Sequence, residues 1–387
     1  MTDVEVSPER VVQAMGLRAV IVGAGWAGEG YTRALRGAGV DVVALCGRTA
    51  GPAYAMGRKL GVVDVRLDWR SAIEDLRPDV VVVATPAGPH RDIVEFAAGL
   101  GCDLVCEKPL GRTAAEALAM LERVEKAGVK HAYGATSRYS PALIQARGLL
   151  DAGLIGELQE VEAIGHWGMP RLMGYSWAHS LEQGGGMLMN VLPHFLGQAQ
   201  YVSGAVPRWV TGFAEPVIDK APVGLPVHDF REWSPVDAGT ADGVEWKSVD
   251  ADMRATVIVG LQRADGTDIR AIWHVSPFAS SRNADHLALA GSEGTLHLTG
   301  FPWHHKLEHK RTGPDDWVDV PISPADGTTD PVQHGWNRLS EEFILDVRGQ
   351  GEPDYPTFRD GYIANQIMDA VRSSKTQPLT GFPGTDV

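Results

Sequence analysis

A glycine-rich turn near the start of the chain constrains its fold more than any other sequence feature. An apolar run at 19–22, rich in β-branched residues, enters the turn, and helical spacing follows it as far as Gly37. The pattern G-x-G-x-x-G between them lets the backbone approach a pyrophosphate at the positive end of the helix dipole. A tight turn without a ligand is the alternative. The predicted dinucleotide cradle consists of Gly23, Gly25, Trp26, Ala27 and Gly28.

Strand-like and helical segments alternate through the rest of the first third of the chain. The strand-like segments are "DVRLDW", "DVVVVAT" and "DLVCEKP", and the helical segments between them are "RSAIEDLR" and "HRDIVEFAAGLG". Strands that are apolar on both faces and alternate with helices indicate a parallel sheet covered on both sides. The fold class predicted for this part of the chain is therefore α/β, with a doubly wound parallel sheet.

The residues after the second strand bear on the choice between NAD and NADP. A carboxylate at this point accepts hydrogen bonds from the ribose hydroxyls and repels a 2'-phosphate. This chain instead has Gly47, Arg48 and Thr49 there. Because an arginine beside a hydroxyl suits a phosphate monoester, the sequence favours NADP over NAD. The alternative is that Arg48 lies in solvent at the tip of a loop.

Length, charge and cysteine usage limit what else the chain can be. Its 387 residues exceed the size at which single cores stop growing, roughly 250 to 300 residues, so we expect two domains. The net charge of -14 argues against a nucleic-acid partner, and no apolar run approaches the roughly 18 residues of a membrane span. The N-terminus has no basic start followed by an apolar stretch, so we expect a cytoplasmic protein. The cysteines lack metal-type spacing and are interpreted as reduced core thiols: Cys46, Cys102 and Cys106.

The sequence changes character beyond about residue 150. The segments "LQEVEAIGHW", "RATVIVGLQR" and "IRAIWHVS" have the period of two that is typical of half-exposed antiparallel strands. A stretch from about Glu215 to Gly243 is rich in Pro, Asp and Gly and reads as a long insertion that could shape substrate access or a subunit contact. Three glycines at 184–186 precede a helix on which Asn190 and His194 share one face.

Several short motifs follow one another in a recognisable order: "GAGWAG", "VVVATPAGPH", "GCDLVCEKPL", "SRYSPA", "GLIGEL", "GGGMLMNVLPH" and "GSEGTLHL". Through these motifs the chain resembles the Gfo/Idh/MocA oxidoreductases across nearly its whole length. The resemblance implies an N-terminal Rossmann domain over 1–135 and a C-terminal α/β domain over 136–387, built on a large, mostly antiparallel open sheet. It also implies a substrate bound between the domains, and a homodimer or homotetramer formed through the sheet of the second domain.

The motif E-K-P implies a role for Lys108. It ends a strand, and ligands of doubly wound sheets bind beyond the carboxyl ends of the strands. The resemblance implies that Lys108 hydrogen-bonds the reacting oxygen and that the following proline, often through a cis bond, fixes the turn. Glu107 could pair with Lys108 or anchor the turn, and His90 could be a capping or packing residue. The cofactor-binding residues expected from these two strand ends are Ala84, Thr85, Pro86, His90, Glu107 and Lys108.

The helix after the three glycines departs from the family pattern. The family usually has aspartate and histidine at the positions of Asn190 and His194. An aspartate would stabilise the imidazolium and raise its affinity for a proton, whereas asparagine supplies no charge. We therefore expect Lys108 to carry more of the proton transfer, unless Asn190 only binds a substrate hydroxyl or the reaction has changed. The predicted catalytic residues are Lys108, His194 and Asn190.

Several aromatic and polar residues are candidates for lining the cleft, because aromatic faces stack on sugar rings and polar groups bind sugar hydroxyls. The histidines at 304, 305 and 309 lack carboxylate or cysteine partners, so no metal site is predicted. Tyr139, Trp167 and His179 are further cleft candidates. The predicted substrate-binding residues are Lys108, Arg138, His166, Trp177, Asn190 and His194.

These features predict an NAD(P)-dependent oxidoreductase that moves a hydride between nicotinamide C4 and a carbon of a sugar, cyclitol or polyol. Lys108 and His194 would handle the proton of the oxygen. One alternative is a nicotinamide-dependent glycosidase that oxidises a sugar transiently and eliminates its aglycone. Another is a non-catalytic sensor of a dinucleotide or sugar, which Asn190 favours and the presence of both Lys108 and His194 does not.

Overall fold

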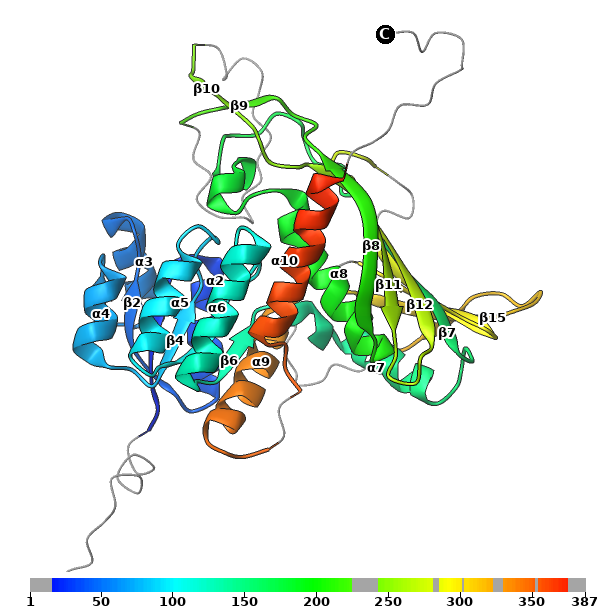
Figure 1. Ribbon diagram of the computed structural model, residues 1–387, viewed down its shortest axis with the longest axis horizontal. Coiled ribbons are helices and arrows are strands. Elements are labelled where there is room, and N and C mark those ends of the chain that lie inside the picture. The colour runs from blue at the N-terminus through cyan, green and yellow to red at the C-terminus, as the bar shows by residue number, and fades with distance from the viewer. Residues whose placement is uncertain are drawn as a thin grey trace, which may run out of the picture.

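The computed structural model shows two lobes, each built on its own β-sheet, with the last helix of the described chain lying between them (Figure 1). Most of the predicted insertion and the first 15 residues, on which the expectation of a cytoplasmic location rested, lie outside the residues that the structure describes. The described residues are 16–224, 243–280, 285–300, 303–322, 330–351 and 354–374.

The first lobe is a six-stranded parallel sheet in the order β3-β2-β1-β4-β5-β6, which confirms the predicted doubly wound fold. The order reverses between β1 and β4, and ligands of such sheets bind in the crevice at this point. The strands are β1 (Arg18–Val22), β2 (Asp41–Cys46), β3 (Val65–Arg66), β4 (Val80–Val83), β5 (Asp103–Cys106) and β6 (His131–Tyr133). The helices are α2 (Trp26–Gly37), α3 (Ala50–Leu60), α4 (Trp69–Leu76), α5 (His90–Gly99) and α6 (Ala114–Ala127).

Both faces of this sheet are covered, as the apolar strands predicted. Alternate residues of β1 enter different cores: Val20 packs into one and Ile21 into the other. The four valines of β4 are completely buried. Because successive side chains of a strand point to opposite faces, a strand that is apolar throughout needs helices on both sides. The three cysteines are buried and free, which confirms their interpretation as core thiols.

The second lobe contains an eight-stranded sheet in the order β16-β15-β14-β13-β7-β12-β11-β8. Only the pairing of β12 with β7 is parallel, so the prediction of a mostly antiparallel open sheet is confirmed. The strands are β7 (Leu158–Gly165), β8 (Val206–Glu215), β11 (Arg254–Gln262), β12 (Asp268–Val275), β13 (Asp285–Gly291), β14 (Gly294–Thr299), β15 (Lys306–Arg311) and β16 (Val318–Val320). A separate ribbon pairs β9 (Lys220–Pro222) with β10 (Trp246–Ser248).

One face of the large sheet packs on α7 (Pro141–Asp151) and α8 (Met187–Ser203) and forms the core of the second lobe. We call the opposite side the outer face. Trp209 and Phe213 of β8 lie on it, and 52% and 44% of their respective surfaces are exposed. The sheet therefore has the half-exposed character that its period of two predicted.

The helices α9 (Pro331–Val347) and α10 (Phe358–Ser373) connect the lobes. The first packs on α2 of the parallel sheet, and the second lies between α6 of the first lobe and α8 and β8 of the second (Figure 1). Gly30 of α2 makes room for this packing, because a Cβ there would overlap the indole ring of Trp336. The expected domain boundary at 135/136 remains a prediction, and the last two helices contact both lobes.

Candidate active site

The turn between β1 and α2 is shaped by close backbone contacts. A Cβ at Gly28 would overlap the carbonyl oxygen of Gly23, and one at Gly23 would overlap that of Ala84. Gly25, the N-cap of α2, has no side chain to cap the helix, and a Cβ there would meet nothing within 4 Å. The N-terminus of α2 is thus uncapped by a side chain and has space beside it, which fits the pyrophosphate of a dinucleotide.

The end of β2 has the exposed side chains that the sequence suggested. Gly47 is confined, since a Cβ there would lie 2.7 Å from the Cβ of Ala53 and 2.9 Å from that of Ala24. Arg48 and Thr49 follow it and are exposed. The guanidinium of Arg48 is therefore accessible to a phosphate near the ribose, and it is equally compatible with a solvated loop.

The end of β4 presents one unsatisfied polar atom. The hydroxyl oxygen of Thr85 is buried and has no hydrogen-bond partner among the described residues. Such a group calls for a ligand or water that completes its hydrogen bonding. Pro86, the next residue, is exposed. This strand end also fits a bound cofactor.

His90, which begins α5, faces the protein interior. Its Nε2 lies 2.8 Å from the carbonyl oxygen of Thr85, and its Nδ1 lies 3.0 Å from that of Leu110. Burial lowers the pKa of the ring, which favours the neutral form. The histidine thus links the end of β4 at Thr85 to the loop after Lys108 through its two ring nitrogens. A contact between His90 and a cofactor remains a prediction.

Lys108 is the second residue after β5, and its peptide bond to Pro109 is cis. The Nζ of Lys108 donates a 3.4 Å hydrogen bond to the backbone carbonyl of Asn190 on α8. Burial lowers the pKa of the ammonium, and the negative charge of Glu107 opposes this effect. The lysine of the first lobe therefore reaches the helix of the second lobe that carries the other predicted catalytic residues.

Glu107 is buried, and its carboxylate is held by three hydrogen bonds. Its Oε1 accepts hydrogen bonds from the hydroxyl of Tyr31 at 3.1 Å and from the indole N–H of Trp336 at 3.3 Å. Its Oε2 accepts the backbone N–H of Lys108 at 3.1 Å. Burial raises the pKa of this carboxyl, while the charge of Lys108 and these hydrogen bonds lower it. The carboxylate ties the turn to α2 and α9.

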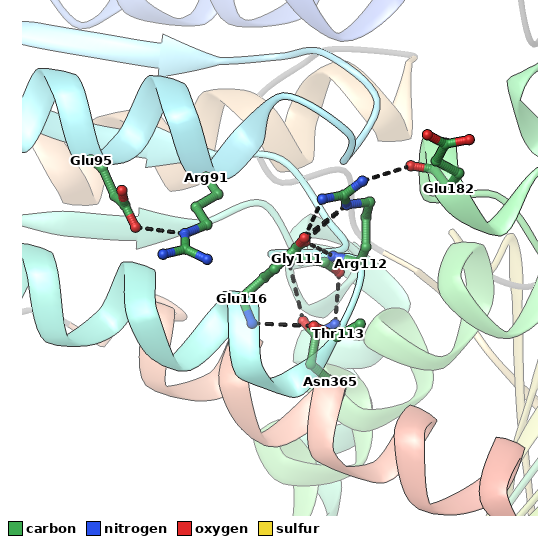
Figure 2. A network of polar contacts seen from close by, with 8 residues as sticks. All are labelled: Arg91, Glu95, Gly111, Arg112, Thr113, Glu116, Glu182 and Asn365. Carbon is green, nitrogen blue, oxygen red and sulfur yellow. Dashed lines mark hydrogen bonds and ion pairs between the residues drawn. The ribbon is translucent and has the colours of Figure 1, made fainter.

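The loop after Lys108 is fixed by α10 (Figure 2). Asn365, which is completely buried, accepts the N–H of Gly111 at 3.2 Å and donates to its carbonyl at 2.7 Å. Arg112 forms an ion pair with Glu116 and also donates to the backbone carbonyl of Glu182 at 3.3 Å. The last contact crosses to the second lobe, into the segment that leads to α8.

The glycines before α8 are required by close packing. A Cβ at Gly184 would lie 2.5 Å from that of Ala87 in the first lobe, and one at Gly185 would overlap the carbonyl of Trp177. Gly186 has a φ of +105°, and a Cβ there would lie 2.9 Å from a carboxylate oxygen of Asp252. These contacts set the start of α8 and therefore the positions of Asn190 and His194.

His194 is buried, and the positive charge of Lys108 lies near it. Its Nδ1 lies 3.1 Å from the hydroxyl oxygen of Ser137, and its ring and that of Trp303 pack in an edge arrangement with 6.0 Å between centroids. Burial lowers the pKa of His194 well below its usual value, and the positive charge of Lys108 lowers it further. Lys108 and His194 are thus close enough to interact electrostatically, and these surroundings favour the neutral imidazole.

Two predicted substrate-binding residues make contacts that do not by themselves support their roles. The guanidinium of Arg138 lies 3.3 Å from a carboxylate oxygen of Asp354 and over the ring of Tyr201. The ring of His166 packs against that of His274 at 5.3 Å, on the outer face. Their roles remain predictions without support from this geometry.

Trp177 begins the 3₁₀ helix η2 (Trp177–His179), whose backbone packs on Gly185 just before α8, and its contact with a substrate remains a prediction. Within the part of the chain that is described, no three His, Cys, Asp or Glu residues are grouped as ligands for a metal ion.

Ser137 and Trp303 are candidate site residues that the sequence did not reveal. Ser137 lies in the 3₁₀ helix η1 (Thr136–Tyr139), inside the motif "SRYSPA". The motif marked the segment, but no spacing rule links a serine to a histidine 57 residues further on. Trp303 joins His194 to Trp26 of the glycine-rich turn, where the two indole rings meet edge to face at 6.3 Å.

Comparisons with known proteins agree with this arrangement. Residues 17–135 match the family described as "Oxidoreductase family, NAD-binding Rossmann fold", and residues 143–297 match the "GFO/IDH/MocA C-terminal domain". Inositol 2-dehydrogenase of Rhizobium meliloti (strain 1021) is 27% identical over 370 residues, which are 93% of this chain and 97% of the relative. D-glucoside 3-dehydrogenase of Escherichia coli (strain K12) is 31% identical over 168 residues, covering 43% of this chain and 47% of the relative.

A solved structure of levoglucosan dehydrogenase in complex with NADH and L-sorbose has a TM-score of 0.76 to this chain. It is 21% identical in sequence, and the match covers 92% of this chain and 96% of the other. This likeness establishes that the two proteins share a fold. Among the described residues, none of the helices combines the length and apolar character that a bilayer span needs.

Proposed function

The chain belongs to the Gfo/Idh/MocA family of oxidoreductases, and from this premise we propose that it is a dehydrogenase of sugars, cyclitols or related polyols. The observation that carries the proposal is the convergence of Lys108 and His194 from different lobes, beyond the carboxyl end of β5. Relatives named for inositol and for a D-glucoside support a polyhydroxylated substrate.

The residues at the strand ends fit a nicotinamide dinucleotide. Its pyrophosphate would lie over Gly25 at the start of α2, and the unsatisfied hydroxyl of Thr85 would contact the cofactor beside β4. When bound, the nicotinamide supplies the chemistry of accepting or returning a hydride. We propose a preference for NADP over NAD, supported by the exposed Arg48 at the end of β2.

Lys108 is the residue that exchanges the proton of the reacting oxygen in this proposal. In alcohol oxidation, the neutral amine accepts the hydroxyl proton as the C–H bond breaks, and in ketone reduction the ammonium donates it. Burial lowers the pKa of Lys108 and so increases the fraction of neutral amine near neutral pH. His194 is neutral and orients the same oxygen through a hydrogen bond.

We also propose that the protein is a homo-oligomer. The outer face exposes Trp209 and Phe213, and large exposed aromatic groups on one surface are typical of an interface. Light scattering of the purified protein tests the oligomeric state: a monomer at micromolar concentration would contradict it.

We further propose a cytoplasmic location, supported by the three buried cysteines that form no disulfide.

A screen of cyclitols and sugars with NAD and NADP tests the proposed reaction. Reduction of the nicotinamide, followed by absorbance, is the expected result, with a higher kcat/KM for NADP. Replacement Arg48→Ala should remove that preference. Release of an aglycone without net reduction would indicate the glycosidase, and binding without any turnover would indicate a sensor. Either outcome would overturn the proposed dehydrogenase.

A further inference from the structure

The segment that connects the lobes holds His194 at a fixed place relative to Lys108. It leaves β6, and the N–H of Gly134 donates a 2.8 Å hydrogen bond to the carbonyl of Cys106, two residues before Lys108. A Cβ at Gly134 would lie 3.0 Å from the Cα of Glu107, so the segment packs directly on the strand end. Three residues later the same segment places Ser137, completely buried, against α8.

The hydroxyl of Ser137 can serve both forms of the His194 ring. At 3.1 Å from Nδ1, it can donate to a bare nitrogen or accept from an N–H. Two other side chains near the ring act differently: Lys108 carries only donors when it is charged, and the indole ring of Trp303 packs on the imidazole with 6.0 Å between centroids. The serine therefore stabilises either tautomer of the neutral imidazole.

We propose that Ser137 is a positioning residue, which holds Nδ1 of His194 so that Nε2 meets the substrate oxygen and allows the ring proton to lie on either nitrogen. This inference rests on the proposed dehydrogenase function, because it assigns His194 to the reacting oxygen. A hydroxyl that both donates and accepts suits a reversible oxidation, since the substrate oxygen is a hydroxyl on one side of the reaction and a carbonyl on the other.

Ser140 provides a matched control. It lies in the same segment, it is 1% exposed, and its hydroxyl has no hydrogen-bond partner among the described residues. Replacing either serine by alanine removes one buried oxygen atom from nearly the same place. Only at Ser137 does the change remove a contact with His194.

Kinetics of Ser137→Ala, Ser137→Thr and Ser140→Ala test the proposal. We expect Ser137→Ala to lower kcat about tenfold, with KM for the nicotinamide unchanged and with an unchanged melting temperature relative to Ser140→Ala. The acidic limb of the pH profile should stay in place, because the neutral amine of Lys108 is the base in the proposed oxidation and His194 keeps a neutral ring. Ser137→Thr should restore kcat. Equal behaviour of the two alanine variants, or a kcat that threonine does not restore, would overturn the proposal.

The ¹⁵N resonances of the His194 ring test the same contact without any substrate. In Ser137→Ala we expect the Nδ1 and Nε2 shifts of His194 to change as the balance of tautomers changes, and in Ser140→Ala to stay as in the wild type. Unchanged ring shifts in Ser137→Ala would refute the positioning role. If the ¹⁵N shifts of His194 change but the wild type oxidises no polyol, the proposed dehydrogenase function is wrong, whereas the hydrogen bond between Ser137 and His194 is confirmed.

Discussion

Lys108 and His194 approach one another from different lobes, and their electrostatic surroundings differ. Lys108 follows the buried carboxylate of Glu107, whose charge partly offsets the effect of burial on the ammonium. His194 is influenced by burial and by the positive charge of Lys108, and both lower its pKa. Burial therefore lowers the pKa of the lysine and favours the neutral form of the histidine, which divides the work between a proton carrier and an orienting group.

Their supports differ in the same way. The turn of Lys108 is tied to α2 and α9 by a carboxylate and to α10 by the amide of Asn365. His194 rests against the neutral hydroxyl of Ser137. Charged and bidentate contacts are stronger than a neutral hydrogen bond, so the lysine side of the site is the more rigid. The first lobe thus contributes a lysine whose turn is rigidly held, and the second lobe contributes a histidine ring that is held less rigidly.

Removing the lysine should have the largest effect. Lys108→Ala is expected to lower kcat by about a thousandfold, within the range of a lost general acid or base, while the Kd for the nicotinamide changes much less. Lys108→Arg keeps the positive charge but cannot release a proton near neutral pH, so we expect nearly the same loss. Steady-state kinetics and fluorescence titration of NADPH measure the two effects. An active arginine variant would show that charge alone is needed.

The second-largest effect is expected from removing the amide of Asn365, which fixes the loop after Lys108. In Asn365→Leu, the N–H and the carbonyl of Gly111 lose their partners in a buried place, which should cost about 2 to 3 kcal/mol of unfolding free energy. We expect kcat to fall about tenfold as the loop loses its position. Gln366→Ala changes the adjacent, exposed residue of α10 and serves as the control in urea unfolding and kinetics. Equal stability of the two variants would contradict this account.

Local features of the site could be predicted from the sequence, and distant ones could not. The glycines of the first turn and the lysine after β5 are recognisable because strand, turn and helix follow each other within a few residues. The contact of Trp336 with Glu107 joins residues 229 positions apart. Helical periodicity predicts a helix there but not the lobe on which it packs. The pairing of Ser137 with His194 depends likewise on how η1 packs on α8.

Residue type alone gave two candidates that the structure does not support. Arg138 and His166 have chemistry that suits a sugar site, and in the structure they contact Asp354 and His274. His166 follows a strand whose buried residues alternate, so a register argument would have assigned it to the outer face. Before a residue is assigned to a site, its side-chain chemistry must therefore be considered together with the face of the strand or helix on which it lies.

Introducing a charge beside the histidine tests the difference between the two surroundings directly. In Asn190→Asp, a carboxylate one helical turn from His194 should stabilise the imidazolium and raise its pKa. The same carboxylate should raise the pKa of Lys108, whose neutral amine is the base in our proposal, so the acidic limb of kcat/KM for oxidation should move to higher pH, by about one unit. Asn190→Leu removes the amide without adding charge. If both variants give the same pH profile, a charge at residue 190 does not act on the group that titrates in the reaction.

The smallest expected effect concerns the contact between the lobes at Arg112. Arg91 and Arg112 each form an ion pair with a glutamate four residues further along, but only the pair of Arg112 is extended to the carbonyl of Glu182 in the second lobe (Figure 2). Exposed ion pairs of this kind contribute roughly 0.3 to 0.5 kcal/mol, so Arg91→Ala should leave stability and kinetics nearly unchanged.

Arg112→Ala should have a similarly small effect on the free energy of unfolding but should release the segment before α8 from the lysine loop. We therefore expect the nicotinamide to dissociate about threefold faster, as for a lost hydrogen bond of roughly 0.6 kcal/mol, in stopped-flow measurements of NADPH fluorescence. Faster release in both arginine variants would point to a general loss of charge. Unchanged release in Arg112→Ala would show that the lobes are held together without this contact, by the packing of Gly184 on Ala87 and of α10 between the sheets.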